Sequence, residues 1–256
     1  MIDNKLDIAI LAAGKGTRMG MGTPKVLIKL KGKPMICHLL DSIDKTTSKN
    51  PFIIVSLENI KELKGALRQY QCRFVIQKEQ LGTGHAVGVL FSNRIKLASN
   101  LLILYGDHPL ISSKTIQKLA SKHNSSDSVF TMLVANVPQF SGIYRNFYHD
   151  GRIVRDSRGD ILKIVEPSDA DKNIMAIREI NPAIFIFKTD WLKNNIGKIK
   201  INRVKREYYL TQLIEIAKQG NTHIQLVEGD ISECFGVNTE SELEVVEKVF
   251  DKQKNN

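Results

Sequence analysis

Two glycines and two cations near the N-terminus have the types and spacing that a polyphosphate requires. The segment LAAGKGTRM, Leu11 to Met19, follows an apolar run that predicts a strand. Backbone N–H groups at such a junction can wrap phosphate oxygens, and glycine permits a close approach. Arg18 adds a planar guanidinium, and Lys25 follows Pro24 on a stiffened turn, so we predict that both act in catalysis. The predicted nucleotide-binding residues of this loop are Leu11, Ala12, Ala13, Gly14, Lys15 and Gly16.

Two familiar phosphate-binding fingerprints do not fit this loop. A dinucleotide-binding loop needs glycine three places after Gly16, where Met19 stands, and a phosphate-loop NTPase needs Lys followed by Ser or Thr after its second glycine. The plainer alternative is a strand-to-helix turn with solvated basic residues, and the spacing alone leaves it open.

A carboxylate further along the chain is a candidate metal ligand. Asp107 stands just beyond the apolar run Leu101 to Tyr105, and open α/β sheets bind ligands at the carboxyl ends of their strands. Mg2+ is commonly held by one carboxylate completed by substrate phosphates and waters. We therefore predict that Asp107 binds Mg2+, the alternative being a loop-forming carboxylate before Pro109.

The elements that must position these residues alternate between strand and helix. Apolar runs predict buried parallel strands at Ile8 to Ala13, Phe52 to Val55, Phe74 to Ile76 and Leu101 to Tyr105. Helical patterns separate or follow them at Pro34 to Ile43, Gly84 to Phe91 and Ser113 to Lys122. This alternation predicts a doubly wound α/β sheet.

After Val134 the pattern changes. Strand-like segments there predict an antiparallel lobe from Arg152 to Arg155, Ile161 to Glu166 and Ile180 to Phe187. Two further helices are expected at Tyr208 to Lys218, before Gly220, and at Ser241 to Phe250.

Composition excludes several classes of protein. The 256 residues, 42% hydrophobic and 25% charged, suit one domain with its own core, and no apolar run approaches the roughly 20 residues that cross a membrane. The start of the chain lacks a secretory signal, so we expect a cytoplasmic protein. The net charge of +10 comes from scattered Lys and Arg, which predicts small polyanionic substrates and no nucleic acid. Three cysteines without a C-x-x-C pair indicate neither disulfides nor zinc.

Specific motifs carry a resemblance to a known family. Leu11 to Met19 with Pro24-Lys25 looks like the signature of sugar-nucleotide transferases with a glycosyltransferase-A-like fold. The segment QKEQLGTGHA, Gln77 to Ala86, is narrower and resembles the N-acetylglucosamine-1-phosphate uridylyltransferases. Further matches follow in order at Tyr105-Gly106-Asp107, Gly151-Arg152-Ile153, Glu166, Glu179-Ile180-Asn181, Glu207 to Thr211 and Gly236-Val237-Asn238, so the resemblance covers nearly the whole chain.

The resemblance implies a fold and a reaction. The fold would be a three-layer, Rossmann-like α/β nucleotidyltransferase domain with a mixed, mostly parallel sheet and a small antiparallel sugar-binding lobe. Residues up to about 110 would form the nucleotide-binding half, those to 238 the sugar-binding half, and 239–256 a C-terminal helix and tail. The reaction would join UTP to N-acetylglucosamine 1-phosphate with Mg2+ and release pyrophosphate.

The same resemblance implies roles for individual residues. Gln77 and Gly82 would read uracil, beside Thr83, and Asn238 would share the metal with Asp107, or else cap the last helix. His85 and His108 are interpreted as structural, because a phosphate monoester is already anionic and needs no general base. The sugar-binding positions would be Tyr105, Gly106, Gly151, Glu166, Asn181 and Tyr209.

The sequence departs from the family in several places. Pro182-Ala183 stands where Thr-Gly is usual, and Gln212 replaces an acid. The aromatic segment 138–150 is longer than expected, which favours either a lid over the sugar or a peripheral loop. No hexapeptide repeats of a left-handed β-helical acetyltransferase half follow, so we expect a monomer or weak dimer. Alternative functions are the same reaction with another sugar 1-phosphate or nucleoside triphosphate, a non-catalytic nucleotide-sugar sensor, or a nucleic-acid binder.

Overall fold

The apolar runs of the first half form four neighbouring parallel strands. The computed structural model describes residues 5–14, 23–47, 49–92, 95–203 and 205–254. Within it the strand order is β5-β4-β1-β6, with parallel pairing throughout. Every residue of β4 is buried, as expected for a strand covered on both faces. The bounds are β1 (Leu6–Leu11), β4 (Phe52–Val55), β5 (Arg73–Ile76) and β6 (Asn100–Tyr105).

The same sheet continues into the second half with mixed pairing. The order beyond β6 is β11-β7-β10-β8-β9, each pairing antiparallel, while β12 pairs parallel with β7. The two expected halves are therefore built on one continuous sheet of ten strands. The bounds are β7 (Phe130–Asn136), β8 (Arg152–Arg155), β9 (Ile161–Val165), β10 (Glu179–Ile180), β11 (Phe185–Lys188) and β12 (Ile224–Glu228).

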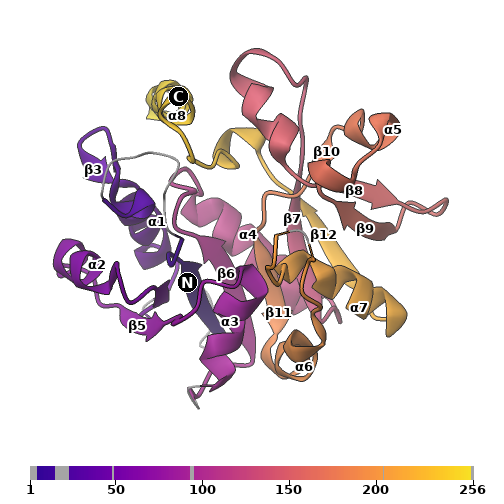
Figure 1. The fold of residues 1–256 in the computed structure, drawn as a ribbon, viewed down its shortest axis with the longest axis horizontal. Helices are drawn as coiled ribbons and strands as arrows, with labels where there is room; N and C mark the ends of the chain where they lie inside the picture. The colour runs from indigo at the N-terminus through magenta and orange to yellow at the C-terminus, as the bar shows by residue number, and fades with distance from the viewer. Residues whose placement is uncertain (1–4, 15–22, 48, 93–94, 204, 255–256) are drawn as a thin grey trace.

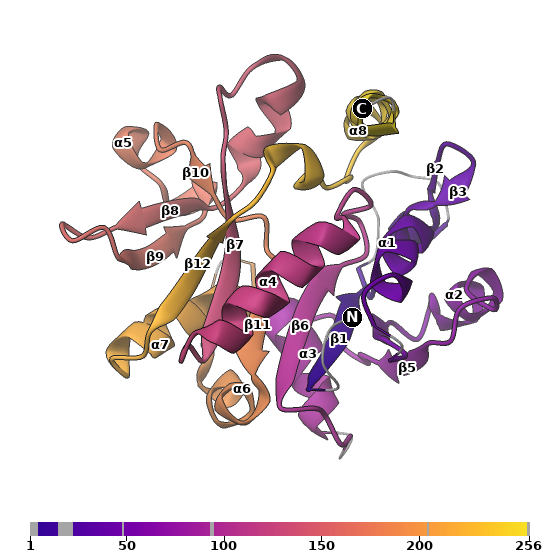
Figure 2. The same ribbon diagram turned by 180° about the vertical axis from the view of Figure 1, so that it is seen from behind.

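Helices cover the two faces of the sheet and make the three layers. Alternate residues of β1 point to opposite faces. Ile8 and Ile10 belong to the core cluster that includes α1 and α4, while Ala9 belongs to the cluster that includes α3, α6 and α7. Figure 1 looks onto α3, α6 and α7, and Figure 2, from behind, onto α1 and α4. The helices are α1 (Met35–Asp44), α2 (Ile60–Ala66), α3 (Thr83–Ser92), α4 (Ser113–Ser125), α5 (Lys172–Met175), α6 (Thr189–Asn195), α7 (Leu213–Gln219) and α8 (Glu240–Lys254). Among the described residues, no helix is both long and apolar enough to span a membrane.

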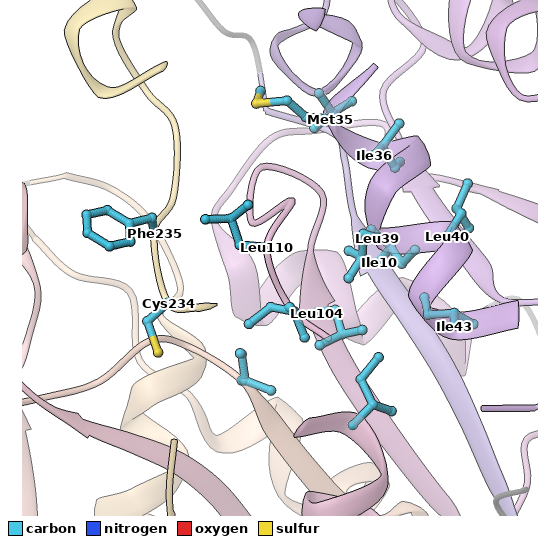
Figure 3. Packing of buried hydrophobic residues seen from close by; sticks show 14 of the residues in the cluster. Ile10, Met35, Ile36, Leu39, Leu40, Ile43, Leu104, Leu110, Cys234 and Phe235 are labelled. Atoms are coloured by element: carbon cyan, nitrogen blue, oxygen red, sulfur yellow. The ribbon is translucent and has the colours of Figure 1, made fainter. Parts of the chain in front are cut away.

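One of the two cores ties distant segments together. Figure 3 shows Ile10 and Leu104 from the sheet, Leu39 from α1, and Phe235 from the segment that leads to α8, all within one cluster. The burial of Phe235 therefore holds the approach to α8 against the nucleotide-binding half.

Two elements differ from the sequence-based expectation. The strand expected at Ile180 to Phe187 is interrupted, because Pro182 lacks an N–H group and Ala183 has a φ of +60°. The helix expected to start at Tyr208 starts at Leu213, because the backbone of Tyr208 pairs instead with Leu81 and Gly84 at 2.8 Å each. A short 3₁₀ turn, η6 (Leu210–Gln212), links the two.

Candidate active site

A cleft of about 650 Å3 opens at the carboxyl ends of β1, β5 and β6. Parallel strands of an open α/β sheet bind ligands at this edge. The residues that line it come from both halves of the chain: Leu11, Ala12, Ala13, Gly14, Lys25, Val26, Gln77, Gln80, Gly82, Thr83, Ala86, Tyr105, Asp107, Glu207 and Asn238. Most of the predicted nucleotide residues and both predicted metal ligands are therefore brought into one cavity.

The predicted phosphate loop leaves β1 at the floor of this cleft. The N–H group of Ala12 donates to Ile54 O at 2.8 Å, and the buried Asn59 side chain donates to Ala12 O at 2.8 Å. These bonds fix the start of the loop, and no described residue lies within 4 Å of a Cβ placed on Gly14. Lys15, Gly16 and Arg18 lie outside the described residues.

One end of the cleft presents amides and backbone suited to a nucleobase. Gln77 is 3% exposed, and its Nε2 donates to Gly82 O at 3.2 Å and lies 3.1 Å from His85 Nδ1. Gly82 has a φ of +93°, and a Cβ there would lie 2.8 Å from Tyr208 O. Both observations require glycine at this position. Gln80 was not predicted as a site residue, yet its buried Oε1 has no hydrogen-bond partner in the described structure.

A cation centre lies within the cleft. Lys25, in the 3₁₀ turn η2 (Lys25–Leu27), donates to Asp107 Oδ2 and, at 2.8 Å, to Asn238 Oδ1. Gly106 permits this approach, since a Cβ there would lie 2.9 Å from Val26 Cγ1. The predicted sugar residue Gly106 thus has a packing role as well. Burial raises the pKa of Asp107, but Lys25 and His108 outweigh it, and the net pKa lies below its ordinary value.

The side-chain oxygens of Asp107 and Asn238 also fit a divalent metal ion. Asp107 Oδ1 is buried and accepts no hydrogen bond from any described residue. The Lys25 ammonium already contacts Asp107 and Asn238 at once, so one cation can reach both oxygens. Carboxylate and amide oxygens suit Mg2+. No cluster of three or more His, Cys, Asp or Glu side chains forms a metal site among the described residues, so further ligands would come from substrate and water.

The remaining predicted sugar residues form a second group beside the cleft. Asn181 N donates to Gly151 O at 3.0 Å, and a Cβ on Gly151 would lie 3.4 Å from Glu166 Oε1. Burial, then the charge of Asp169, raises the pKa of Glu166. Tyr209 hydrogen-bonds Glu207, which lines the cleft but was not predicted. The group therefore adjoins the nucleotide end through this pair.

Two departures from the family pattern now have physical accounts. Ala183 adopts the left-handed conformation at the position of the usual glycine, and its N–H donates to Asn181 Oδ1 at 3.0 Å. The Asn181 oxygen is therefore engaged within the chain, and its NH2 group is the donor of this side chain. Gln212 accepts from Lys200 N at 3.0 Å and donates to Lys200 O at 2.8 Å. A carboxylate cannot donate, so the amide suits this pairing better than the usual acid.

The aromatic segment 138–150 packs against the approach to α8. It contains the 3₁₀ helix η3 (Gly142–His149), whose buried Phe147 has its ring 4.5 Å from that of Phe235. Arg152, fully buried, donates to backbone carbonyls of this segment, including Tyr148 O at 2.9 Å. The segment is thus anchored in the core by Phe147 and to the sheet by Arg152.

Comparison with known proteins places this chain in a family. The model of the MobA-like NTP transferase domain matches residues 8–185. The chain belongs to the MobA-like NTP transferase family. The chain is 40% identical over 246 residues to the bifunctional protein GlmU of Thermosipho africanus and 35% identical over 248 residues to that of Caldicellulosiruptor saccharolyticus. Both alignments cover 96% of this chain and 51–52% of the relative, so the chain spans about half their length.

A further relative and two solved structures are also similar to this chain. The bifunctional protein GlmU of Desulfotalea psychrophila is 34% identical over 254 residues, covering 99% of this chain and 73% of that protein. A CMP-2-keto-3-deoxy-manno-octonic acid synthetase structure with CTP has a TM-score of 0.67 at 18% identity, covering 98% of this chain and all of that one. A Bacillus anthracis structure provisionally titled a glucose-1-phosphate thymidylyltransferase reaches 0.72 at 15% identity, covering 95% and 94%. The expected nucleotidyltransferase fold and family resemblance are confirmed.

Proposed function

We propose that this MobA-like NTP transferase domain joins UTP to N-acetylglucosamine 1-phosphate and releases pyrophosphate. The observation that carries the proposal is that one cleft unites two kinds of group. Gln77 and Gly82 present an amide and backbone atoms, and Lys25, Asp107 and Asn238 form the cation centre. The group around Glu166 lies beside this cleft and is linked to it through Tyr209 and Glu207. A base would meet the amide end, a triphosphate the cation centre, and the sugar the group around Glu166.

For this reaction the chain would have to hold the sugar phosphate in line with the α-phosphorus of UTP and neutralise the charge of the phosphates. An oxygen of the sugar phosphate forms a bond to the α-phosphorus of UTP while the bond from that phosphorus to the bridging oxygen of pyrophosphate breaks. The attacking phosphate is already anionic, so no side chain must remove a proton. A Mg2+ ion held by Asp107 and Asn238 would neutralise charge on the phosphates. Lys25 would contact phosphate oxygens at the same centre, and Arg18 is proposed as a second cation.

The two ends of the cleft would select the substrates. Gln77 is held by Gly82 O and His85, so its amide presents a fixed edge to a pyrimidine. Glu166 would accept from sugar hydroxyls and the Asn181 NH2 group would donate to them. We also propose that the protein works in the cytoplasm as a monomer or weak dimer, without nucleic acid or membrane partners.

One specific observation supports a second candidate. Pro182 and Ala183 replace a backbone donor and a flexible glycine beside Asn181. A different sugar 1-phosphate would then be used in the same reaction. A non-catalytic sensor is disfavoured by the intact cation centre.

The test is pyrophosphate release by purified protein with UTP, Mg2+ and N-acetylglucosamine 1-phosphate. Parallel reactions contain CTP, GTP or dTTP in place of UTP, or glucose 1-phosphate in place of the amino sugar. Release specific to the first mixture supports the proposal, and release only with a control sugar supports the second candidate. Binding of UTP with no pyrophosphate release from any mixture would support the non-catalytic sensor.

A further inference from the structure

The start of α8 contains a reciprocal set of hydrogen bonds. Glu242 N donates to Thr239 Oγ1 at 3.2 Å, and Thr239 N donates to Glu242 Oε2 at 3.2 Å. This is a capping box, in which the first residue and the residue three places later satisfy each other's backbone donors. The sequence signal is Thr-x-x-Glu, at Thr239 to Glu242.

The Glu242 carboxylate also extends beyond the helix. Its Oε2 accepts a second hydrogen bond, from the N–H group of Asn238, one residue before the cap. On the other side of Asn238, Val237 N donates to Asp107 O at 3.1 Å. The backbone of Asn238 is therefore fixed from both directions, while its Oδ1 accepts from Lys25.

The helix that supplies Glu242 is itself docked on the nucleotide-binding half. Val246 is fully buried, Phe250 packs edge-on against His38 of α1 with ring centroids 5.1 Å apart, and Asp251 pairs with Lys31 at 2.8 Å. Lys31 lies in the turn between β2 (Lys29–Leu30) and β3 (Lys33–Pro34), and both ribbon views show α8 on that side of the molecule (Figures 1 and 2). Glu242 therefore stands on an anchored support and not on a free terminal helix.

We infer that Glu242 is a positioning residue for the metal ligand Asn238. Its carboxylate orients the Asn238 backbone, so that Oδ1 meets the cation also held by Asp107. This inference rests on the proposed function for the identity of the cation. It predicts that Glu242 sets the Mg2+ requirement although it lies outside the substrate cleft.

The matched variants are Glu242→Ala and Thr239→Ala. Both break the capping box, but only the first removes the acceptor for Asn238 N. Glu242→Gln keeps an acceptor oxygen at the same reach, and Glu242→Asp keeps the charge on a side chain one methylene shorter. Two readouts apply to each purified full-length protein. The first is the Mg2+ concentration that half-saturates pyrophosphate release, and the second is Mn2+ bound without turnover, measured by water-proton relaxation.

We expect Glu242→Ala to raise the half-saturating Mg2+ concentration about tenfold and to weaken Mn2+ binding about tenfold, because one charge-assisted hydrogen bond is lost. Glu242→Asp should show the same losses as Glu242→Ala, and Glu242→Gln should recover most of the binding. Thr239→Ala should change either value less than about twofold. The Thr239 hydroxyl caps Glu242 N, whereas the Glu242 carboxylate bonds the Asn238 N–H group itself. If Glu242→Ala does not fold, the Asp and Gln pair decides the question.

The outcomes separate this inference from the proposed function. A wild-type protein that neither binds Mn2+ nor releases pyrophosphate contradicts the proposed function. A wild-type protein that does both, with Glu242→Ala and Glu242→Asp matching Thr239→Ala in metal requirement, overturns the inference alone.

Discussion

The buried His123 makes stability depend on pH in a way that the structure predicts in sign and size. The side chain is 3% exposed, its Nδ1 lies 2.7 Å from Thr131 Oγ1, and its Nε2 lies 3.2 Å from Asn100 Oδ1. Burial, and secondarily the charge of Lys188, lowers the pKa of His123 from 6.5 to about 4. Between these two pKa values, His123 of the native protein stays neutral while His123 of the unfolded chain binds a proton.

The sign and the size follow from proton linkage. Between pH 6.5 and pH 4 the unfolded chain binds more protons, so the free energy of unfolding falls as the pH falls through this range. A depression from 6.5 to about 4 is about 2.5 pH units. At about 1.4 kcal/mol per unit, the full loss is roughly 3 kcal/mol.

A difference measurement isolates this contribution. Burial raises the pKa of Asp150 to about 8, which makes the native protein more stable as the pH falls and opposes His123 over the same range. Urea unfolding of wild type and His123→Gln at several pH values removes that shared effect. The stability advantage of the wild type should shrink by roughly 2 kcal/mol between pH 6.5 and pH 4.5. An advantage that stays constant over this range would refute the assignment of a neutral, buried His123.

Three further predictions concern the site and its backbone. Asp107→Asn and Asn238→Ala should each lower Mg2+-dependent pyrophosphate release by about 100-fold with little change in Tm; unchanged turnover in both would remove the metal assignment. Gly82→Ala should lower the free energy of unfolding by about 2 kcal/mol or more, because its φ is +93° and Tyr208 O blocks the methyl; urea curves superimposable on wild type would contradict this. Ala183→Gly should raise the free energy of unfolding by about 0.5–1 kcal/mol, because the relief of left-handed strain in the native state exceeds the added freedom of the unfolded chain. A loss of stability would show that the methyl group packs favourably.

The parts of the fold that sequence predicted are those whose cause is local. β4 and β6 appear as apolar runs because they are buried on both faces, so each residue carries the signal. Asp107 was located for the same reason, since it follows β6 directly. The break at Pro182 shows the limit, because Ile180 before it and Ile184 after it are apolar and buried whether or not the strand continues.

Contacts between distant segments could not be predicted in this way. Gly82 was predicted from its motif, but its tight fit to Tyr208 joins segments that no periodicity relates. Gln80 and Glu207 lie within motifs quoted for other residues, and only the pairing of those motifs places both side chains in the cleft. The sequence left the aromatic segment 138–150 as either a lid or a peripheral loop. The contact between the tilted rings of Phe147 and Phe235, which are distant in sequence, shows where the segment packs.

The cation centre joins segments from both halves of the chain. Lys25 reaches Asp107 across 82 residues of sequence and Asn238 across 213, so three segments meet at one ammonium group. Gln77 is held by partners within the first half, whereas the geometry of the Asn238 oxygen depends on α8 and on the core around Phe235. A substitution in α8 that weakens its docking should therefore change the proposed metal requirement first and leave the proposed base recognition at Gln77 intact, because only the former depends on Asn238, which lies outside the parallel strands.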